Sequence, residues 1–207
     1  MEKIIGIVDY GMGNINSVYN ALTYLGYEAE IVTTVQEIER CSHLIVPGVG
    51  SYAKAMANIA ELGVDVAIVN HAKMGKPLLG ICLGMQILSE VGEEGGNIKG
   101  LGLIPGRVQL LDLVDLPVPH VGWNSLNFNA DHPMFASLKK HVDFYFVHSY
   151  FFDVESPENV LASSDYGNQF AAIVGKKNIV GIQFHPEKSQ DNGLLLIENF
   201  CEWNGEC

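Results

Sequence analysis

The chain has 207 residues, of which 48% are hydrophobic and 17% charged, and its formal net charge is -12. This length supports one sizeable core, so we expect a single α/β domain over residues 1–207. The acidic balance argues against nucleic-acid binding, because such a surface repels phosphate groups. No apolar run approaches the roughly 20 residues needed to cross a bilayer, and no signal-peptide pattern is present. We therefore expect a cytoplasmic protein that does not act at a membrane.

The first half of the sequence alternates short apolar runs with segments of helical spacing. We expect strands at 4–8, 28–33, 43–46 and 76–81, and helices at 14–25, 51–62 and 83–91. Ser51 stands where the second of these helices would be capped. Strands that alternate with helices pair in parallel, so the pattern predicts a doubly wound, mostly parallel sheet flanked by helices.

After residue 102 the pattern changes to strands without long helices between them. We expect strands at 107–111, 144–152, 160–164, 170–174 and 179–184, with a hairpin turn at 175–178 and a closing helix at 194–203. An antiparallel region is therefore expected to extend the sheet in the C-terminal half. No linker or repeat separates the two halves, so the change does not predict a domain boundary.

The sequence Gly80-Ile81-Cys82-Leu83-Gly84 follows an apolar strand and precedes a helical segment. A nucleophile on a sharp strand-to-helix turn needs small residues two positions away on either side. A helix that begins at Cys82 would also favour the reactive thiolate. A buried structural cysteine between packing glycines is the alternative, but this junction favours a nucleophile.

A base and its orienting group are predicted near the other end, in the sequence Phe184-His185-Pro186-Glu187. His185 follows an apolar strand, and Glu187 stands within reach of its far ring nitrogen. A cysteine, a histidine and a carboxylate form an activated nucleophile, in which the carboxylate fixes the tautomer of the ring. A loop histidine beside a surface glutamate is the simpler alternative, which a strong cysteine site elsewhere makes less attractive.

Backbone N–H donors for a negative oxygen are predicted in two places. The turn Pro47-Gly48-Val49-Gly50 follows the third strand, and its glycines let N–H groups approach a ligand closely. The N–H of Leu83, directly after Cys82, is the second candidate. Each such donor lowers an acyl-transfer barrier by roughly 3–4 kcal/mol.

These motifs, in this order, resemble the class I (triad) glutamine amidotransferases. Further segments, around 9–14, 119–124, 144–150 and 184–189, are similar to the glutaminase subunits of imidazole glycerol phosphate synthases, and the resemblance covers about residues 4–203. It implies release of ammonia from L-glutamine through a Cys82 thioester, without a cofactor or metal. It also implies a heterodimer with a barrel-shaped cyclase subunit that uses the ammonia in histidine synthesis.

The resemblance assigns roles to individual residues. Cys82, His185 and Glu187 would be catalytic; Gly48, Val49, Gly50, Leu83, Gln86, Ser149 and Tyr150 would bind the oxyanion or substrate; and Asn14, Trp123 and Lys188 would contact the partner. Many relatives carry a third glycine where this chain has Val49. We hypothesise that this side chain makes one oxyanion donor depend on partner binding.

Three other functions compete with this interpretation. A related glutaminase could serve another synthase, such as one acting on a nucleotide-activated sugar. An inactive binding module is disfavoured, because Cys82, His185 and Glu187 are all present, together with Gly80 and Gly84 on either side of the cysteine. A cysteine peptidase is disfavoured because Gln86 and the 47–50 turn suit a small amide.

Two further signals do not point to cofactors or metals. Gly11-Met12-Gly13 lacks the third glycine of a dinucleotide loop. The cysteines and histidines are not spaced as a metal set: Cys41, Cys82, Cys201 and Cys207; His120, His132, His141 and His148.

Overall fold

An eight-stranded sheet runs through the molecule in the computed structural model, which describes residues 3–139 and 142–206. Its strands follow the order β2-β1-β3-β4-β14-β13-β12-β9. The bounds are β1 Ile5–Val8, β2 Ala29–Val32, β3 His43–Gly48, β4 Leu78–Cys82, β9 Asn127–Phe128, β12 Val160–Tyr166, β13 Asn168–Lys176 and β14 Ile179–Ile182. Strands β2 to β14 in this order pair in parallel, and β13, β12 and β9 extend the sheet antiparallel. The predicted fold class is confirmed.

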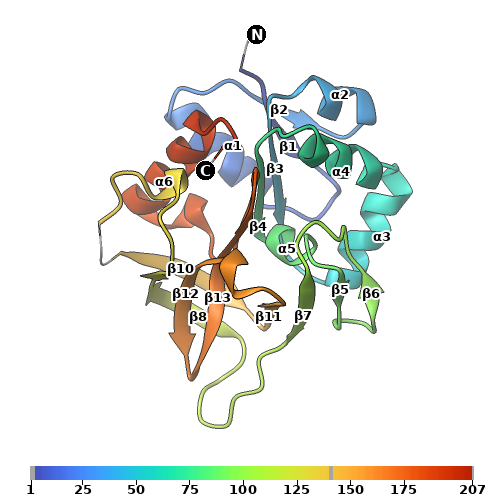
Figure 1. Ribbon diagram of the computed structural model, residues 1–207. Helices are drawn as coiled ribbons and strands as arrows, with labels where there is room; N and C mark the ends of the chain where they lie inside the picture. Colours follow the sequence, from blue (N-terminus) through green and yellow to red (C-terminus); the bar gives the residue numbers. More distant parts are fainter. Residues whose placement is uncertain (1–2, 140–141, 207) are drawn as a thin grey trace.

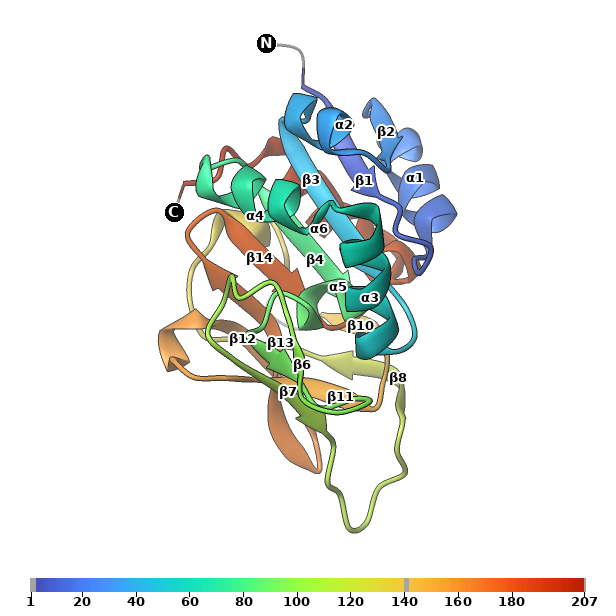
Figure 2. The same cartoon turned by 90° about the vertical axis from the view of Figure 1, so that its right-hand side faces the viewer.

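Helices cover both faces of the parallel half (Figures 1 and 2). Helices α1 (Ile15–Tyr24) and α6 (Gln190–Glu202) pack on one face. Helices α2 (Val35–Arg40), α3 (Tyr52–Leu62) and α4 (Asp65–Lys73) pack on the other. Alternate side chains of the strands point to opposite faces, so both faces of the apolar strands are buried in separate clusters.

Two smaller sheets flank the antiparallel half, in the lower part of Figure 1. Strand β10 (Asp143–His148) pairs with β8 (His120–Ser125). Strands β11 (Tyr150–Val154), β7 (Gly106–Leu110), β5 (Val91–Gly92) and β6 (Ile98–Lys99) form the second sheet. Short 3-10 helices lie at η1 Pro133–Phe135, η2 Pro157–Asn159 and η3 Pro186–Lys188. The connection from β7 to β8 loops away from the body of the molecule (Figure 2).

The helix predicted over 83–91 is wrong in length, because α5 covers only Leu83–Gln86. The carbonyls of Ile87, Leu88 and Ser89 accept hydrogen bonds from backbone N–H groups of residues 101–104. These long-range bonds replace the bonds that would continue the helix. The chain then enters β5 at Val91, a residue that the sequence placed in the helix.

The single strand predicted over 144–152 is also wrong, because the chain changes sheets at Ser149. Strand β10 ends at His148 and pairs with β8, whereas β11 begins at Tyr150 and pairs with β7. A continuous aromatic pattern does not reveal this change of partner. The change of sheet is important because it exposes the backbone around Ser149 to the cavity described below.

Helices α2 and α4 and the strands β5, β6, β8 and β9 were not predicted from the sequence. Helix α2 carries a recognisable signal, since Thr34 and Glu37 form a capping box at its start. Helix α4 and strand β8 have weaker patterns. Helix α6 begins at Gln190, four residues before the predicted start at 194. The hairpin between β13 and β14 lies where it was predicted. Among the described residues, each helix is too short or too polar to span a bilayer.

Replacement of Gly84 by Ala is expected to destabilise the fold strongly. A Cβ at Gly84 would overlap the backbone carbonyl of Val46 at the end of β3. We expect urea unfolding of Gly84→Ala to show a loss of about 3 kcal/mol or more. Gly63→Ala is the control, because Gly63 has φ +68 but no atoms near its missing Cβ, and it should cost only roughly 1–2 kcal/mol. Equal losses would contradict the close approach of α5 to β3.

Candidate active site

The carboxyl ends of the parallel strands meet at one edge of the sheet, where open α/β folds bind their ligands. Strand β14 pairs with β4 so that Ile182 lies opposite Ile81. The residues that follow these two strands therefore emerge side by side. This register brings Cys82 next to a segment about a hundred residues away in the chain, and that segment leads to His185.

Cys82 lies on a strained turn between β4 and α5. Its backbone has φ 54 and ψ -110, a conformation that costs a residue with a Cβ free energy. A Cβ at Gly80 would lie 2.6 Å from the carbonyl oxygen of Gly84, and one at Gly84 would overlap Val46. Both flanking glycines are therefore required by the turn, as the sequence predicted. The helix that follows Cys82 favours the thiolate less than the sequence predicted, because α5 is a single turn and contributes mainly its first N–H groups.

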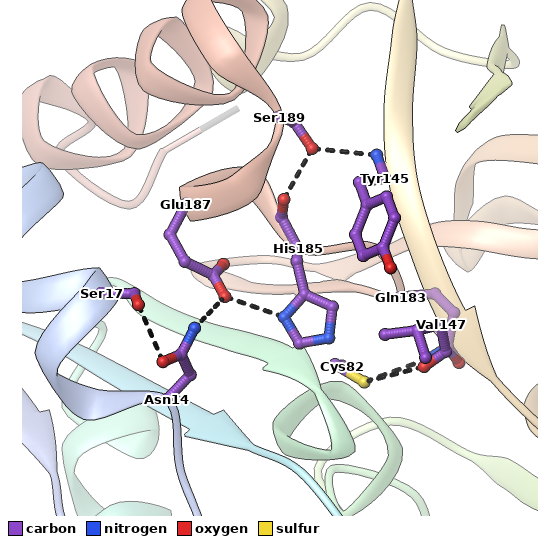
Figure 3. Close-up of polar contacts among 9 residues, drawn as sticks. All are labelled: Asn14, Ser17, Cys82, Tyr145, Val147, Gln183, His185, Glu187 and Ser189. Carbon is purple, nitrogen blue, oxygen red and sulfur yellow. Dashed lines mark hydrogen bonds and ion pairs between the residues drawn. The ribbon is translucent and has the colours of Figure 1, made fainter. Parts of the chain in front are cut away.

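A chain of hydrogen bonds runs from α1 to His185 (Figure 3). Nδ1 of His185 lies 2.8 Å from Oε1 of Glu187. The amide of Asn14 donates to the same carboxylate oxygen over 3.1 Å, and the hydroxyl of Ser17 donates to Oδ1 of Asn14 over 2.8 Å. The side chains of His185 and Glu187 are 1% and 0% exposed, so this ion pair is shielded from water.

The backbone of His185 is held from both sides. Its N–H donates to the carbonyl of Tyr145 over 2.9 Å, and its carbonyl accepts from the hydroxyl of Ser189 over 2.6 Å. The N–H of Tyr145 donates to the same hydroxyl over 3.0 Å, which closes a loop of bonds with β10 (Figure 3). His185 lies three residues beyond β14 rather than on its tip, so these bonds, and not the strand, fix its position.

The ring of His185 is favoured in its charged form. Burial by itself lowers its pKa, but the contacts with Cys82 and Glu187 outweigh burial and raise the pKa to about 9. Burial by itself raises the pKa of Glu187, but the hydrogen bond and charge of His185 lower it. The Nε2 atom makes no hydrogen bond within the described chain, and the ring edge points toward the sulfur of Cys82 (Figure 3). A cysteine, a histidine and a carboxylate placed in this way are able to act as nucleophile, base and orienting group.

A cavity of about 370 Å³ opens beside Cys82 and His185. Six of the seven residues predicted to bind the oxyanion or substrate line it: Val49, Gly50, Leu83, Gln86, Ser149 and Tyr150. Gly48 does not line the cavity. A Cβ at Gly48 would overlap the hydroxyl of Tyr10, so close packing is sufficient to require glycine there.

The N–H of Val49, a candidate oxyanion donor, is already used. It donates to the carbonyl of Met12 over 3.0 Å, so it is turned away from the cavity in this conformation. Leu83 is the first residue of α5, where backbone N–H groups have no partner within the helix. In this conformation the N–H of Val49 is occupied, whereas the N–H of Leu83 lies in the first turn of α5, directly after Cys82.

Four lining residues were not predicted: Glu94, Pro119, Val147 and His148. Glu94 is the most informative, because its carboxylate accepts the N–H of Tyr52 at the start of α3 over 2.7 Å. Ser51 occupies the N-cap position as expected, yet its side chain makes no capping bond. No spacing rule connects Glu94 to the other site residues, so only the fold reveals its place in the cavity.

The three residues predicted to contact a partner have different environments. Trp123 is 49% exposed and packs edge-to-face on Tyr145 with ring centroids 6.1 Å apart, and Lys188 is exposed. Asn14 is half-buried, and its amide faces Glu187. Its contact with the carboxylate is a role the sequence did not suggest. The interface role of all three residues remains a prediction.

The buried histidines bond to each other and to the backbone. Nδ1 of His120 lies 3.0 Å from Nε2 of His148, and Nδ1 of His148 lies 2.9 Å from the carbonyl of Tyr150. Burial lowers the pKa of His120, and it lowers the pKa of His148 to about 4, so both rings are neutral. In the described parts of the chain, no three His, Cys, Asp or Glu side chains are grouped to hold a metal ion. His141 and Cys207 lie outside the described residues.

Comparison with known proteins identifies the family. The family described as glutamine amidotransferase class-I matches residues 6–202. The imidazole glycerol phosphate synthase subunit HisH of Desulfitobacterium hafniense is 47% identical over 203 residues, covering 98% of this chain and 96% of that protein. The chain therefore belongs to the class I glutamine amidotransferases. Within this family it is a member of the HisH group, as the sequence resemblance predicted.

Other relatives agree with this assignment. The HisH subunit of Moorella thermoacetica is 46% identical over 198 residues, covering 96% of this chain and 94% of that protein. A Thermotoga maritima structure described as PurLQS matches with a TM-score of 0.76 at 22% identity, covering 97% of this chain and 98% of that chain. At this identity the structural match supports the amidotransferase fold alone.

Glu187→Gln is expected to lower the pKa of His185 and to change how stability depends on pH. In the wild type, the raised pKa of His185 stabilises the fold fully below its ordinary value of 6.5, and this contribution is lost as the pH rises through about 9. At pH 6 the variant should be less stable by about 2 kcal/mol. The difference should shrink between pH 6.5 and 9.

Urea unfolding at several pH values measures this difference. Glu158→Gln, on the exposed η2 turn, is the matched control and should leave the stability unchanged. A wild-type-minus-variant difference that is constant from pH 6 to 9 would show that the charge of Glu187 does not act through His185.

Proposed function

We propose that this chain is the glutaminase subunit of an imidazole glycerol phosphate synthase and releases ammonia from L-glutamine. The observation that carries the proposal is the strained turn that presents Cys82 to the free ring nitrogen of His185, whose other nitrogen is bonded to Glu187. The cavity beside these residues has room for a small amide. Membership of the HisH group supports the choice of reaction.

In the proposed mechanism the thiolate of Cys82 attacks the side-chain carbonyl carbon of glutamine. The C–N bond then breaks, and Nε2 of His185 gives its proton to the departing nitrogen, which leaves as ammonia. A thioester between Cys82 and the glutamyl group remains. His185 next takes a proton from water, the hydroxide adds to the thioester carbonyl, and glutamate leaves as the thiolate re-forms. Glu187 keeps the Nδ1 proton on its own side throughout, so that Nε2 faces the reaction.

The lining residues match the amino-acid end of the substrate. Among the described residues that line this cavity, Glu94 alone carries a carboxylate, so it is suited to the α-ammonium group. The amide nitrogen of Gln86 already donates to Tyr150 and Gln183, which leaves the carbonyl oxygen of Gln86 as an acceptor. We assign the backbone around Ser149 to the α-carboxylate.

The oxyanion site offers a means of control. The N–H of Leu83 would stabilise the negative oxygen of the tetrahedral intermediate, with Val49 supplying a second donor. The peptide of Val49 must rotate to release its bond with Met12 before it can act. We infer that contact with the synthase partner drives this rotation. The isolated subunit would then hydrolyse glutamine slowly and would not waste substrate.

The proposed partner is a cyclase subunit that forms a heterodimer with this chain and accepts ammonia directly. Ammonia in neutral water is mostly ammonium, which is not a nucleophile, so direct transfer preserves its reactivity. The exposed Trp123 and Val121 on β8 and the exposed Lys188 near His185 supply the contact surface. Cys41 and Cys201 are buried free thiols, which fits a reducing compartment such as the cytoplasm.

Glutamate formation, with and without the cyclase subunit and its nucleotide ligand, tests the function. We expect the complete complex to be faster by about 10²-fold, the effect of one oxyanion donor. Cys82→Ala should release no ammonia, yet its complex should still use added ammonium at raised pH.

Three outcomes would contradict parts of the proposal. Equal rates for the isolated chain and the complex would exclude control through Val49. Glutaminase activity that this cyclase does not stimulate would indicate another synthase, such as one acting on a nucleotide-activated sugar. Loss of the ammonium-dependent reaction in Cys82→Ala would mean that Cys82 is structural.

A further inference from the structure

Gln183 is a buried polar residue beside the nucleophile that the mechanism above does not use. It lies between β14 and His185, and it is 0% exposed. Its amide nitrogen Nε2 lies 3.8 Å from the sulfur of Cys82, within the range of a hydrogen bond to sulfur, and Figure 3 shows the two side chains together. A fully buried carboxamide that touches a reacting atom calls for a chemical explanation.

The orientation of this carboxamide is fixed by its neighbours. The carbonyl of Tyr150 can only accept, so the atom of Gln86 that lies 3.0 Å from it must be the amide nitrogen. The same nitrogen lies 3.1 Å from the far end of Gln183, which must therefore be the carbonyl oxygen. The N–H group of Gln183 is consequently directed at Cys82. A backbone carbonyl thus sets the direction of both amides.

The sulfur of Cys82 meets two groups with opposite preferences. The carbonyl of Val147, 4.0 Å away, can only accept and therefore favours the protonated thiol. The N–H of Gln183 can only donate to sulfur and therefore favours the thiolate. The described residues that line the cavity include no Lys or Arg, so the negative sulfur depends on His185 and on fixed dipoles. A buried dipole that is already oriented stabilises charge without reorganisation.

We propose that Gln183 is a further catalytic residue, which donates a hydrogen bond to the Cys82 thiolate and is held in that direction by Gln86 and the Tyr150 carbonyl. This inference rests on the proposed function, since it refines how the same nucleophile is activated. In this account Gln86 has two roles, because it contacts the substrate and its hydrogen bond also orients the carboxamide of Gln183. Gln183 stabilises the thiolate before attack and again when the thioester is cleaved.

Gln183→Leu and Gln183→Met test the proposal, because both keep the side chain's bulk and remove its donor. The alkylation rate of Cys82 by iodoacetamide at pH 7, followed by peptide mass spectrometry, should fall by about tenfold or more, the value of one hydrogen bond to a charged group. The ultraviolet thiolate band, taken as a difference from Cys82→Ser, should weaken in parallel. This band reports ionisation without depending on access of the reagent. In the complex with the cyclase, kcat should fall by a similar factor and KM for glutamine should change little.

Gln169→Leu is the matched control, because Gln169 is an exposed glutamine on the neighbouring strand that donates to Ser163. It should alkylate at the wild-type rate. If Gln183→Leu does not fold, the same measurements are made on Gln183→Met, because the unbranched Met side chain adapts more readily to the space. Wild-type alkylation and an unchanged thiolate band in a folded donor-free variant would overturn the proposal and leave Gln183 a packing residue. The alkylation rate and the thiolate band do not require glutamine, so failure of the glutaminase assignment would be seen separately.

Discussion

The backbone of Cys82 is the constraint on which the site depends. A residue with a Cβ is held at φ 54 only where the surroundings leave no alternative. Here the surroundings are Gly80 and Gly84 on either side of the cysteine, and strand β3, whose Val46 carbonyl lies against Gly84. Strands β3 and β4 pair so that Gly48 lies opposite Cys82, and this pairing places the 48–50 turn beside the sulfur. Strain at one residue thus requires close packing of β3, β4 and α5, and that packing builds the cavity.

The site also depends on the buried carboxylate of Glu187, which must have enough hydrogen-bond and charge partners. An ionised carboxylate away from water is costly unless it is paired and hydrogen-bonded. Glu187 meets this condition through His185 and through Asn14, which is anchored in turn by Ser17 on α1. The first βα unit is therefore coupled to the last, across more than 170 residues of chain. The parallel registers of β1, β3, β4 and β14 make this contact possible.

The sequence predicts those parts of the site in which local chemistry and local structure coincide. Cys82 stands at a strand-to-helix junction with glycines at the required spacing, and His185 and Glu187 are two residues apart. The same holds for the parallel strands, whose apolar runs are continuous because both faces are buried. These features could be read before the fold was known.

The remainder depends on contacts between distant segments. Nothing near Glu94 in sequence indicates that it enters the cavity, and nothing near Asn14 indicates Glu187. The direction of the Val49 N–H is decided by Met12, and the length of α5 by hydrogen bonds from residues 101–104. The predicted strand over 144–152 divides because two different sheets accept its halves. Pattern analysis describes a segment's own preference, whereas these outcomes are decided by its partners.

Direct detection of the covalent intermediate tests the central claim that Cys82 is the nucleophile. The complex with the cyclase would be mixed with glutamine, stopped in acid during turnover and digested for mass spectrometry. A glutamyl group on the peptide that contains Cys82, absent from Cys82→Ser, is the predicted result. Turnover of glutamine with a glutamyl group on another residue, or with none on Cys82 under conditions where hydrolysis is slowed, would contradict it.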